Sequence, residues 1–185
     1  VLEKHNEISF RMTKEKATQL MGKTMEDIGK ILFPMFVEAK RNAVVNEFGT
    51  EEVKYLTENG AVLYEGLEEV LAELHGNYKL YIVSNCQDGY VSAFLHAHKL
   101  ERYFQDIEMS GRTGQDKGSN IKMIMERNNI KSAVYIGDTE GDEKAARFAG
   151  IPFIYAEYGF GNAVSPDAVI MQIKQLPKCI KEKFI

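Results

Sequence analysis

The sequence has few cysteines, no basic excess and no long apolar run, and each shortage argues against a class of protein. Its 2 cysteines, Cys86 and Cys179, lie far apart without the spacing of a metal site, so reduced thiols in a cytoplasmic protein are expected. No apolar run approaches a membrane span and no signal peptide is visible, so no membrane association is expected. The formal net charge of -4 argues mildly against binding of nucleic acid.

The overall composition is that of an ordinary globular protein. The chain has 185 residues, of which 44% are hydrophobic and 27% charged, and this suits one domain or one domain with an insertion. Such a length can bury a substantial core without disulfides or a structural metal.

Residues 1–60 carry patterns typical of helices only. Thr24 followed by Asp27 predicts a helix start. Pro34 is expected to open a second helix, because proline suits a first helical turn and not a helix interior. A shorter third helix is expected at residues 51–56. These patterns predict a small helical bundle over residues 1–60.

Residues 61–185 alternate between strand and helix patterns. Strands alternating with helices indicate right-handed crossovers and a parallel sheet that is covered on both faces. We therefore predict an α/β fold in which residues 61–185 form a doubly wound parallel sheet and residues 1–60 an inserted helical cap. The expected strands lie at 79–83, 107–110, 133–136, 151–156 and 168–170.

Two acidic residues follow the expected strand at 133–136. Asp138 comes directly after that strand, and Asp142 opens the next helix. Ligands bind at the carboxyl ends of strands in open α/β sheets. Two neighbouring carboxylates repel each other unless a cation lies between them, and Mg²⁺ prefers such oxygen ligands. Asp138 and Asp142 are therefore candidate metal ligands, although Asp142 could instead serve only as a favourable first-turn helix residue.

Two further polar stretches are expected at the same edge of the sheet. Ser84 and Asn85 follow the strand at 79–83, and Lys117 lies in a glycine-rich loop. A hydroxyl, a backbone amide and an ammonium are groups that bind a phosphoryl group. Each also has a plainer interpretation: Ser84 could cap the next helix, and Lys117 could be a solvated loop lysine.

Other phosphate-binding motifs fail on inspection. The loop around Lys117 is not a nucleotide-binding P-loop, because Asp116 precedes the lysine and Gly118 follows it. The Gly159-Phe160-Gly161 stretch is half of a dinucleotide fingerprint, but it lies too late for a following strand-helix-strand unit.

The three polar stretches, in this order, resemble motifs of the haloacid dehalogenase superfamily, in its phosphatase branch with a helical cap. YIVSN resembles the second motif, QDKGSNI the third and GDTEGD the fourth. The resemblance implies that the Ser84 hydroxyl and the Asn85 amide bind phosphoryl oxygens and that Lys117 stabilises their charge. It further implies that Asp138 coordinates Mg²⁺ and that Asp142 supports the site. The texture of AARFAGIPFIYAEYGFG is similar to the phosphoglycolate phosphatase-like subgroup.

One family motif is absent. The first motif, Asp-x-Asp after an N-terminal strand, would supply the nucleophile, and no Asp-x-Asp occurs in this chain. The chain begins at Val1 without methionine, in what the sequence suggests is the end of a helix. We therefore expect an upstream segment that contributes this motif and a central strand, and we expect residues 1–185 alone to be inactive.

The resemblance implies a Mg²⁺-dependent phosphatase that hydrolyses a small phosphorylated metabolite through an aspartyl-phosphate. Lys23, in the cap, is a candidate substrate contact. A phosphosugar mutase of the β-phosphoglucomutase type is one alternative, and Gly137 with Asp142 favours the phosphatase over it. A non-catalytic module that binds phosphate or a partner is the other. The particular ester and the oligomeric state are left open.

Overall fold

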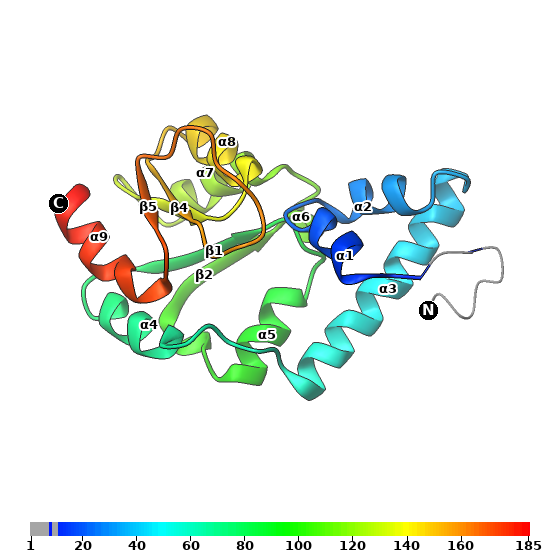
Figure 1. Cartoon of the computed structure of the whole chain (residues 1–185), viewed down its shortest axis with the longest axis horizontal. Helices are drawn as coiled ribbons and strands as arrows, with labels where there is room; N and C mark the ends of the chain where they lie inside the picture. Colours follow the sequence, from blue (N-terminus) through cyan, green and yellow to red (C-terminus); the bar gives the residue numbers. More distant parts are fainter. Residues whose placement is uncertain (1–7, 9–10) are drawn as a thin grey trace.

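The computed structural model describes Ile8 and residues 11–185. The expectation that the chain begins within a helix concerns residues 1–6, which lie outside this described part. Figure 1 shows two regions side by side, with α1, α2 and α3 in one and all the strands in the other. We refer to residues 11–59 as the helical segment.

The helical segment consists of α1 (Lys14–Leu20), α2 (Met25–Leu32) and α3 (Glu38–Asn59). The predicted start of α2 is confirmed, because the Thr24 hydroxyl accepts a hydrogen bond of 3.2 Å from the Asp27 amide. Aromatic and branched side chains between α2 and α3 form a core of its own. The buried residues of this core are Phe33, Phe36, Val44 and Val45.

The helix α3 differs from the prediction of two separate helices. Pro34 lies in a turn rather than at a helix start, and α3 begins only at Glu38. The helix then continues through Gly49, whose missing side chain leaves room for that of Gln87. The residues expected to form two separate helices therefore belong to one continuous helix, which contacts the other region at Gly49.

The strands confirm the predicted α/β fold with parallel pairing. β1 (Leu80–Ser84) pairs with β2 (Phe104–Met109), and β3 (Tyr135–Gly137), β4 (Phe153–Ala156) and β5 (Ala168–Ile170) pair in that order. All three pairings are parallel. The strand expected at 107–110 begins earlier than predicted and ends at Met109, because α6 (Ser110–Thr113) starts at the next residue.

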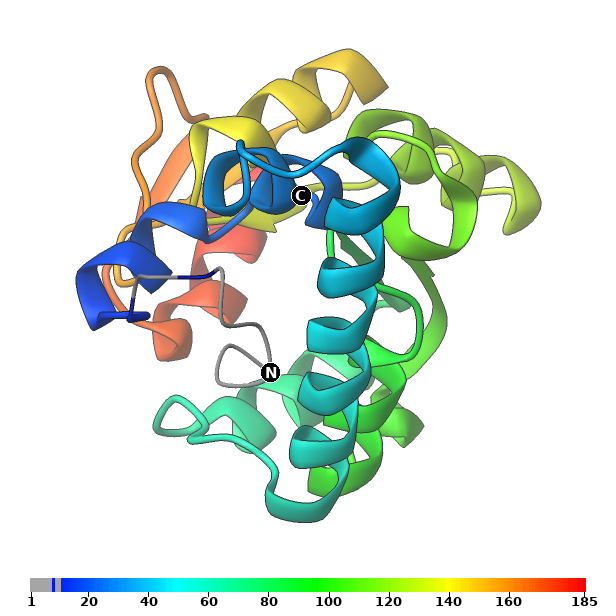
Figure 2. The same ribbon diagram turned by 90° about the vertical axis from the view of Figure 1, so that its right-hand side faces the viewer.

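Helices cover both faces of the strands (Figure 1). Buried side chains of α4 and α5 pack on one face of β1 and β2, while those of α7 and α8 pack on β4. Figure 2 shows α3 running along α5, so the helical segment contacts the α/β region through these two helices. The bounds of the covering helices are α4 Leu67–His75, α5 Tyr90–His98, α7 Lys117–Arg127, α8 Glu140–Ala149 and α9 Leu176–Lys183, with short 3-10 turns at Glu101–Tyr103 and Ile173–Gln175.

The two sheets are separated by a gap between β1 and β3. Within the described part of the chain no ladder of backbone hydrogen bonds joins them. A side chain makes the link instead, because the Tyr135 hydroxyl donates to the Val83 carbonyl at 2.9 Å. Burial raises the pKa of Tyr135 to about 12, so this hydroxyl keeps its proton at neutral pH. A cavity of about 670 Å³ extends along the gap and is lined largely by apolar side chains, among them Leu80, Ile121, Ile136 and Leu176.

The N-cap of α7 gives a first prediction. The Asp116 carboxylate accepts a hydrogen bond of 3.0 Å from the Ser119 amide, which lowers the pKa of Asp116 below its ordinary 3.8. Asp116→Ala should lower the free energy of unfolding by about 1 kcal/mol at pH 7, measured by urea denaturation.

The pH dependence of this effect follows from the lowered pKa. The charged cap contributes fully above the unfolded-state pKa near 3.8 and is lost as the pH falls through the folded-state value. The difference between the wild type and Asp116→Ala should therefore shrink below about pH 4. Asp116→Asn, which can still accept the hydrogen bond, is the control and should not show this loss. An unchanged difference at pH 3 would contradict the prediction.

Candidate functional site

Asp142 stabilises the turn between β3 and α8. Its Oδ2 accepts hydrogen bonds from the backbone amides of Asp138 at 3.2 Å and Thr139 at 3.0 Å, and from the Thr139 hydroxyl at 2.7 Å. In return the Thr139 Oγ1 accepts from the Asp142 amide at 3.1 Å. This is a capping box, so Asp142 is a first-turn helix residue as the plainer interpretation has it. One oxygen of the carboxylate is thereby fully used in holding the turn.

The other oxygen of Asp142 forms an ion pair with Lys117. The Lys117 Nζ donates to Asp142 Oδ1, and the two side chains are only 12% and 5% exposed. Burial alone would lower the pKa of Lys117, but the neighbouring oxygens of Tyr135, Asp142 and Asp138 outweigh it and the pKa is raised. Lys117 is therefore charged and buried, which rules out the interpretation of a solvated loop lysine.

Gly137 is required by the position of Asp142. A Cβ atom built on Gly137 would lie 2.6 Å from the Asp142 Cγ and 2.9 Å from its Oδ2. Real side chains do not approach so closely, so any larger residue at 137 would displace the Asp142 carboxylate. The glycine and the aspartate therefore form a single structural unit.

Asp138 is held from the opposite side by the loop after β4. Its Oδ2 accepts a hydrogen bond of 2.7 Å from the Phe160 amide. Gly159 and Gly161 lie against Asp138 so closely that a Cβ atom on either would collide with it. The Gly159-Phe160-Gly161 stretch, which sequence reasoning treated only as a failed fingerprint, is thus a clamp on Asp138. The two glycines were visible in the sequence, but their partner Asp138 lies more than 20 residues earlier in the chain, so the sequence did not show the contact.

The fit of these groups to Mg²⁺ differs between the two aspartates. Both Asp142 oxygens have partners, whereas no hydrogen bond within the described residues reaches Oδ1 of Asp138. Across Ile8 and residues 11–185, no three His, Cys, Asp or Glu side chains gather as a metal cluster. Mg²⁺ commonly takes one or two carboxylates and completes its shell with water and substrate oxygens. The donor set fits such a partial site, with Asp138 as the available carboxylate.

Ser84 is the last residue of β1, one residue beyond the predicted end of the strand, and Asn85 begins the turn that follows. The Ser84 Oγ accepts a hydrogen bond of 3.3 Å from the Cys86 amide. Ser84 does not cap the next helix, because α5 begins at Tyr90 with Gly89 as its N-cap. The Asn85 Nδ2 donates to the Gly22 carbonyl of the helical segment at 2.7 Å.

Lys23 directly follows Gly22, which contacts Asn85, but the Lys23 side chain lines a pocket outside the candidate site. It is exposed, and it lines a pocket of about 360 Å³ within the helical segment, together with Gln19 and Ile31. No hydrogen bond or ion pair within the described part of the chain joins Lys23 to Ser84, Lys117 or Asp138. The structure thus brings Gly22 rather than the Lys23 side chain to the edge of the site.

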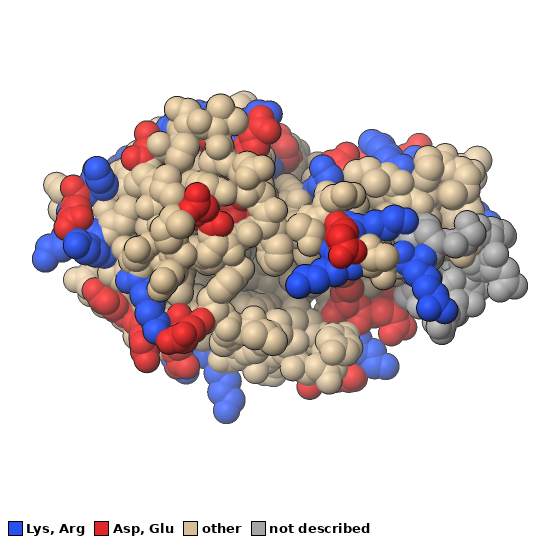
Figure 3. All heavy atoms as spheres, in the orientation of Figure 1, with Lys and Arg blue, Asp and Glu red and all other residues tan. Residues whose placement is uncertain are grey.

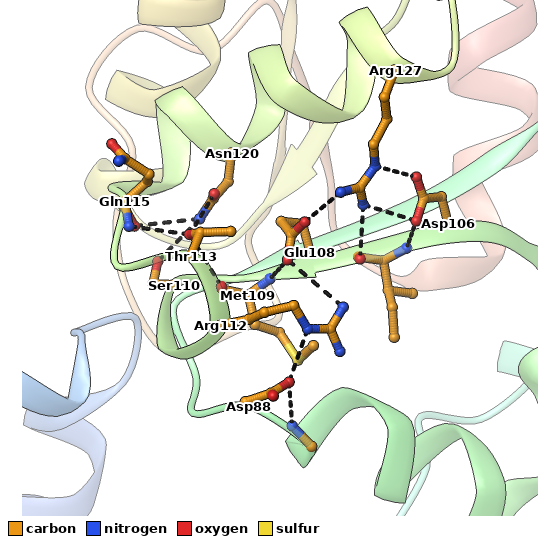
Figure 4. Close-up of polar contacts among 12 residues, drawn as sticks. Asp88, Asp106, Glu108, Met109, Ser110, Arg112, Thr113, Gln115, Asn120 and Arg127 are labelled. Carbon is orange, nitrogen blue, oxygen red and sulfur yellow. Dashed lines mark hydrogen bonds and ion pairs between the residues drawn. The ribbon is translucent and has the colours of Figure 1, made fainter.

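A network of ion pairs that sequence reasoning missed supports the turn after β1 (Figure 4). The carboxylate of Glu108 on β2 is only 2% exposed and lies 2.6 Å from Arg127 Nη1 and 3.8 Å from Arg112 Nη1. Arg112 in turn contacts Asp88 Oδ1 at 3.0 Å, and Arg127 contacts Asp106 at 2.6 Å. Breaking such a buried pair costs more than an exposed one. The partners lie on β2, α6, α7 and the turn after β1, and only the Glu108–Arg112 pair, four residues apart, has a spacing that a local pattern could have shown.

The fold and these side chains define an α/β protein whose polar groups gather at the carboxyl ends of its strands, where such folds bind ligands. Residues 2–156 match the family described as haloacid dehalogenase-like hydrolase, and the chain belongs to that family. None of the helices in the described part of the chain is both long enough and apolar enough to cross a membrane.

Individual relatives agree with this assignment. The chain is similar to the phosphoglycolate phosphatase of Pseudomonas fluorescens (strain Pf0-1), with 26% identity over 130 residues, 64% of this chain and 48% of that protein. The chain thus spans about half the length of the curated relatives it matches. Its fold resembles a predicted phosphatase from Clostridium acetobutylicum, with a TM-score of 0.78 and 24% identity over 93% of this chain and 83% of that one. It also resembles the HAD-hydrolase YfnB from Bacillus subtilis bound to magnesium, with a TM-score of 0.67 and 20% identity over 97% and 87% of the two chains.

The buried pair of Lys117 and Asp142 gives a second prediction. Lys117→Met leaves the Asp142 carboxylate buried without a counter-charge, so it should lower the free energy of unfolding by about 3–5 kcal/mol. The double variant Lys117→Met/Asp142→Asn should recover part of this loss, because no buried charge is left unpaired. Chemical denaturation of the wild type, of the two single variants Lys117→Met and Asp142→Asn, and of the double variant measures the coupling.

The control for this experiment is an exposed pair on α8. Lys144 lies 2.6 Å from Glu140, with side chains 73% and 54% exposed. Lys144→Met should leave the free energy of unfolding nearly unchanged, since exposed ion pairs contribute little. Equal effects of Lys117→Met and Lys144→Met would show that burial of the site pair is not what stabilises it.

Proposed function

We propose that this chain is the cap and most of the core of a Mg²⁺-dependent phosphatase that hydrolyses a small phosphomonoester. The observation that carries the proposal is the convergence of polar groups at the carboxyl ends of parallel strands. Lys117, Asp138 and Asp142 are joined there by direct bonds or by close charges. The shared family and the similarity to a phosphoglycolate phosphatase support the same activity.

Each group then has a role in phosphoryl transfer. The Ser84 hydroxyl and the Asn85 amide would bind equatorial oxygens of the phosphoryl group, and the Lys117 ammonium would offset their charge. Asp142 keeps Lys117 charged and in place. Catalysis of this type depends mainly on positioning and charge, so a rigid, buried lysine suits it better than a mobile one.

Asp138 would hold Mg²⁺, with Asp142 beside it in the supporting role that its hydrogen bonds favour. Mg²⁺, when bound, would supply positive charge that neutralises the phosphoryl oxygens. The clamp formed by the Phe160 amide fixes one oxygen of Asp138 and leaves the other for the ion. The magnesium found with YfnB supports the choice of metal.

We propose that the nucleophile comes from a segment preceding Val1, which would fill the gap between β1 and β3. Both strands offer backbone groups along that gap, and unpaired buried backbone groups are costly. The cavity of about 670 Å³ is lined largely by apolar side chains and includes residues of both β1 and β3. An aspartate at the end of such a strand would attack phosphorus, release the alcohol, and be restored when water hydrolyses the aspartyl-phosphate.

The helical segment would act as a cap that closes over the substrate and excludes water. Gly22 already lies against Thr139 and Asn85, so the cap reaches both loops of the site. On the face seen in Figure 3, Lys and Arg side chains lie on this region beside Asp and Glu side chains. Lys23 stays a candidate contact that would need its side chain to turn toward the site. The free thiols Cys86 and Cys179 favour a reducing compartment such as the cytoplasm.

Among the alternatives, a phosphosugar mutase is disfavoured by Gly137. Mutases resemble this chain but tend to have glutamate at that position, and a side chain there would displace the Asp142 carboxylate. A non-catalytic phosphate-binding module would not need the available oxygen on Asp138.

Enzyme assays test the proposed activity. The full-length protein with Mg²⁺ should release phosphate from one or more esters in a panel of phosphoglycolate, sugar phosphates and nucleotides. Asp138→Asn should lower kcat by about a hundredfold or more. Asp27→Asn, on the exposed surface of α2, is the matched control and should keep wild-type turnover. Absence of hydrolysis across the panel would favour the binding module, and conversion of one phosphosugar isomer to another would favour the mutase.

Hydrogen exchange tests the proposed upstream strand. In the full-length protein, amides of β1 and β3 should exchange more slowly than in residues 1–185 alone, relative to β4. β4 is the internal control, because it is already paired on both edges by β3 and β5. Residues 1–185 alone should show no turnover. Equal relative exchange in both chains, or turnover by residues 1–185, would contradict the proposed strand.

A further inference from the structure

A continuous chain of hydrogen bonds runs from the loop between α6 and α7, through Asn120 of α7, to the helical segment. The Gln115 amide donates to Thr113 Oγ1 at 3.1 Å, and the Thr113 hydroxyl donates to Asn120 Oδ1 at 2.8 Å. The Asn120 Nδ2 donates to Ser110 Oγ at 3.5 Å and to the Gln115 carbonyl at 3.3 Å. Figure 4 shows these side chains converging at the start of α7.

The chain continues beyond Ser110 into the turn after β1. The Ser110 hydroxyl donates to Asn85 Oδ1 at 3.1 Å, and Asn85 Nδ2 donates to the Gly22 carbonyl at 2.7 Å. Asn120 is 0% exposed and Ser110 8%, so water cannot readily replace the bond between them, whereas the Asn85–Gly22 bond lies at the solvent-exposed end of the chain. The buried members of such a chain are strengthened by mutual polarisation.

The two ends of the chain dictate its direction. The first member is the backbone amide of Gln115, which can only donate, and the last is the carbonyl of Gly22, which can only accept. The contact between Asn120 Nδ2 and the Gln115 carbonyl independently fixes the orientation of the Asn120 amide. The Gly22 carbonyl likewise fixes the orientation of the Asn85 side-chain amide, and the Ser110 hydroxyl then donates to Asn85 Oδ1. Asn85 consequently presents its NH₂ group, and not its oxygen, to Gly22.

The Gly22 loop is fitted for this contact. Its φ of +76° is a conformation that favours glycine, and a Cβ there would lie 3.0 Å from Thr139 Cγ2. The absence of a side chain therefore lets the loop rest against the β3–α8 turn while Asn85 binds its carbonyl. One loop of the helical segment thus contacts both strand ends of the candidate site.

We propose that the Asn85 carboxamide is a latch that holds the helical segment closed over the site, and that Ser110 and Asn120 are positioning residues that set its orientation. The latch goes beyond the proposed phosphatase activity, because it concerns access to the site and exists without turnover. The latch requires that Asn85 present its NH₂ donor to the Gly22 carbonyl. Replacing that donor by an acceptor should therefore release the Gly22 loop from the turn after β1.

Hydrogen exchange measured by mass spectrometry on the full-length protein tests the latch. Asn85→Asp keeps the shape of the side chain but places an acceptor opposite the Gly22 carbonyl, and exchange of residues 21–24 should rise about tenfold. Ser110→Ala removes the hydroxyl that holds the Asn85 side-chain carboxamide, so that group can rotate. Exchange of residues 21–24 should then rise by a smaller factor. Ser110→Thr, which keeps the hydroxyl, should restore exchange to the wild-type level.

Asn77→Asp is the matched control. Asn77 Nδ2 also donates to a backbone carbonyl, that of Glu73 at 2.8 Å, but Asn77 lies in the turn after α4 and not beside the helical segment. This variant should leave exchange of residues 21–24 unchanged. Unchanged exchange in a folded Asn85→Asp protein would overturn the latch, and so would an equal rise in Asn77→Asp. Absence of phosphate release by the wild-type protein, together with raised exchange of residues 21–24 in Asn85→Asp, would count against the phosphatase alone, so the two proposals fail separately.

Discussion

The buried charge pair between Lys117 and Asp142 is the constraint on which the rest of the site depends. A carboxylate that is nearly removed from water needs both a counter-charge and hydrogen bonds, and Asp142 obtains them from α7 and from the turn that it caps. Satisfying one side chain therefore fixes the start of two helices relative to β3. Gly137 follows from the same requirement, since a larger residue would occupy the place of the carboxylate.

The second level of organisation is polar and reaches between regions. The Glu108 network ties β2 to α7 and to the turn after β1, and the chain through Asn120 ties the same turn to the Gly22 loop. Each connection joins elements that already pack through apolar cores. The polar groups therefore specify how these elements are oriented and add little to the apolar stabilisation. This suggests why the edge of the site can be rigid while it borders a gap between two sheets.

Much of the fold could be predicted because its signals are local. Alternating strand and helix patterns led to a parallel α/β fold, and Thr24 marked the start of α2 correctly. The candidate residues Ser84, Asp138 and Asp142 were visible because each stands at the expected end of a strand or start of a helix, whereas Lys117 was expected in a loop and proves to be the first residue of α7. The error in α3 arose where local reasoning failed, since Gly49 serves a contact with Gln87 that lies far along the chain.

The sequence by itself determined the element types, the family and the order of the polar motifs, because these depend on periodicity and on short spacings. Only the tertiary structure decided which oxygen of each aspartate is occupied, that Gly159 and Gly161 clamp Asp138, and that Asn85 faces Gly22. The physical reason is that hydrogen bonds and close packing join residues tens of positions apart. No pattern along the chain records which donor meets which acceptor once the strands and helices have packed.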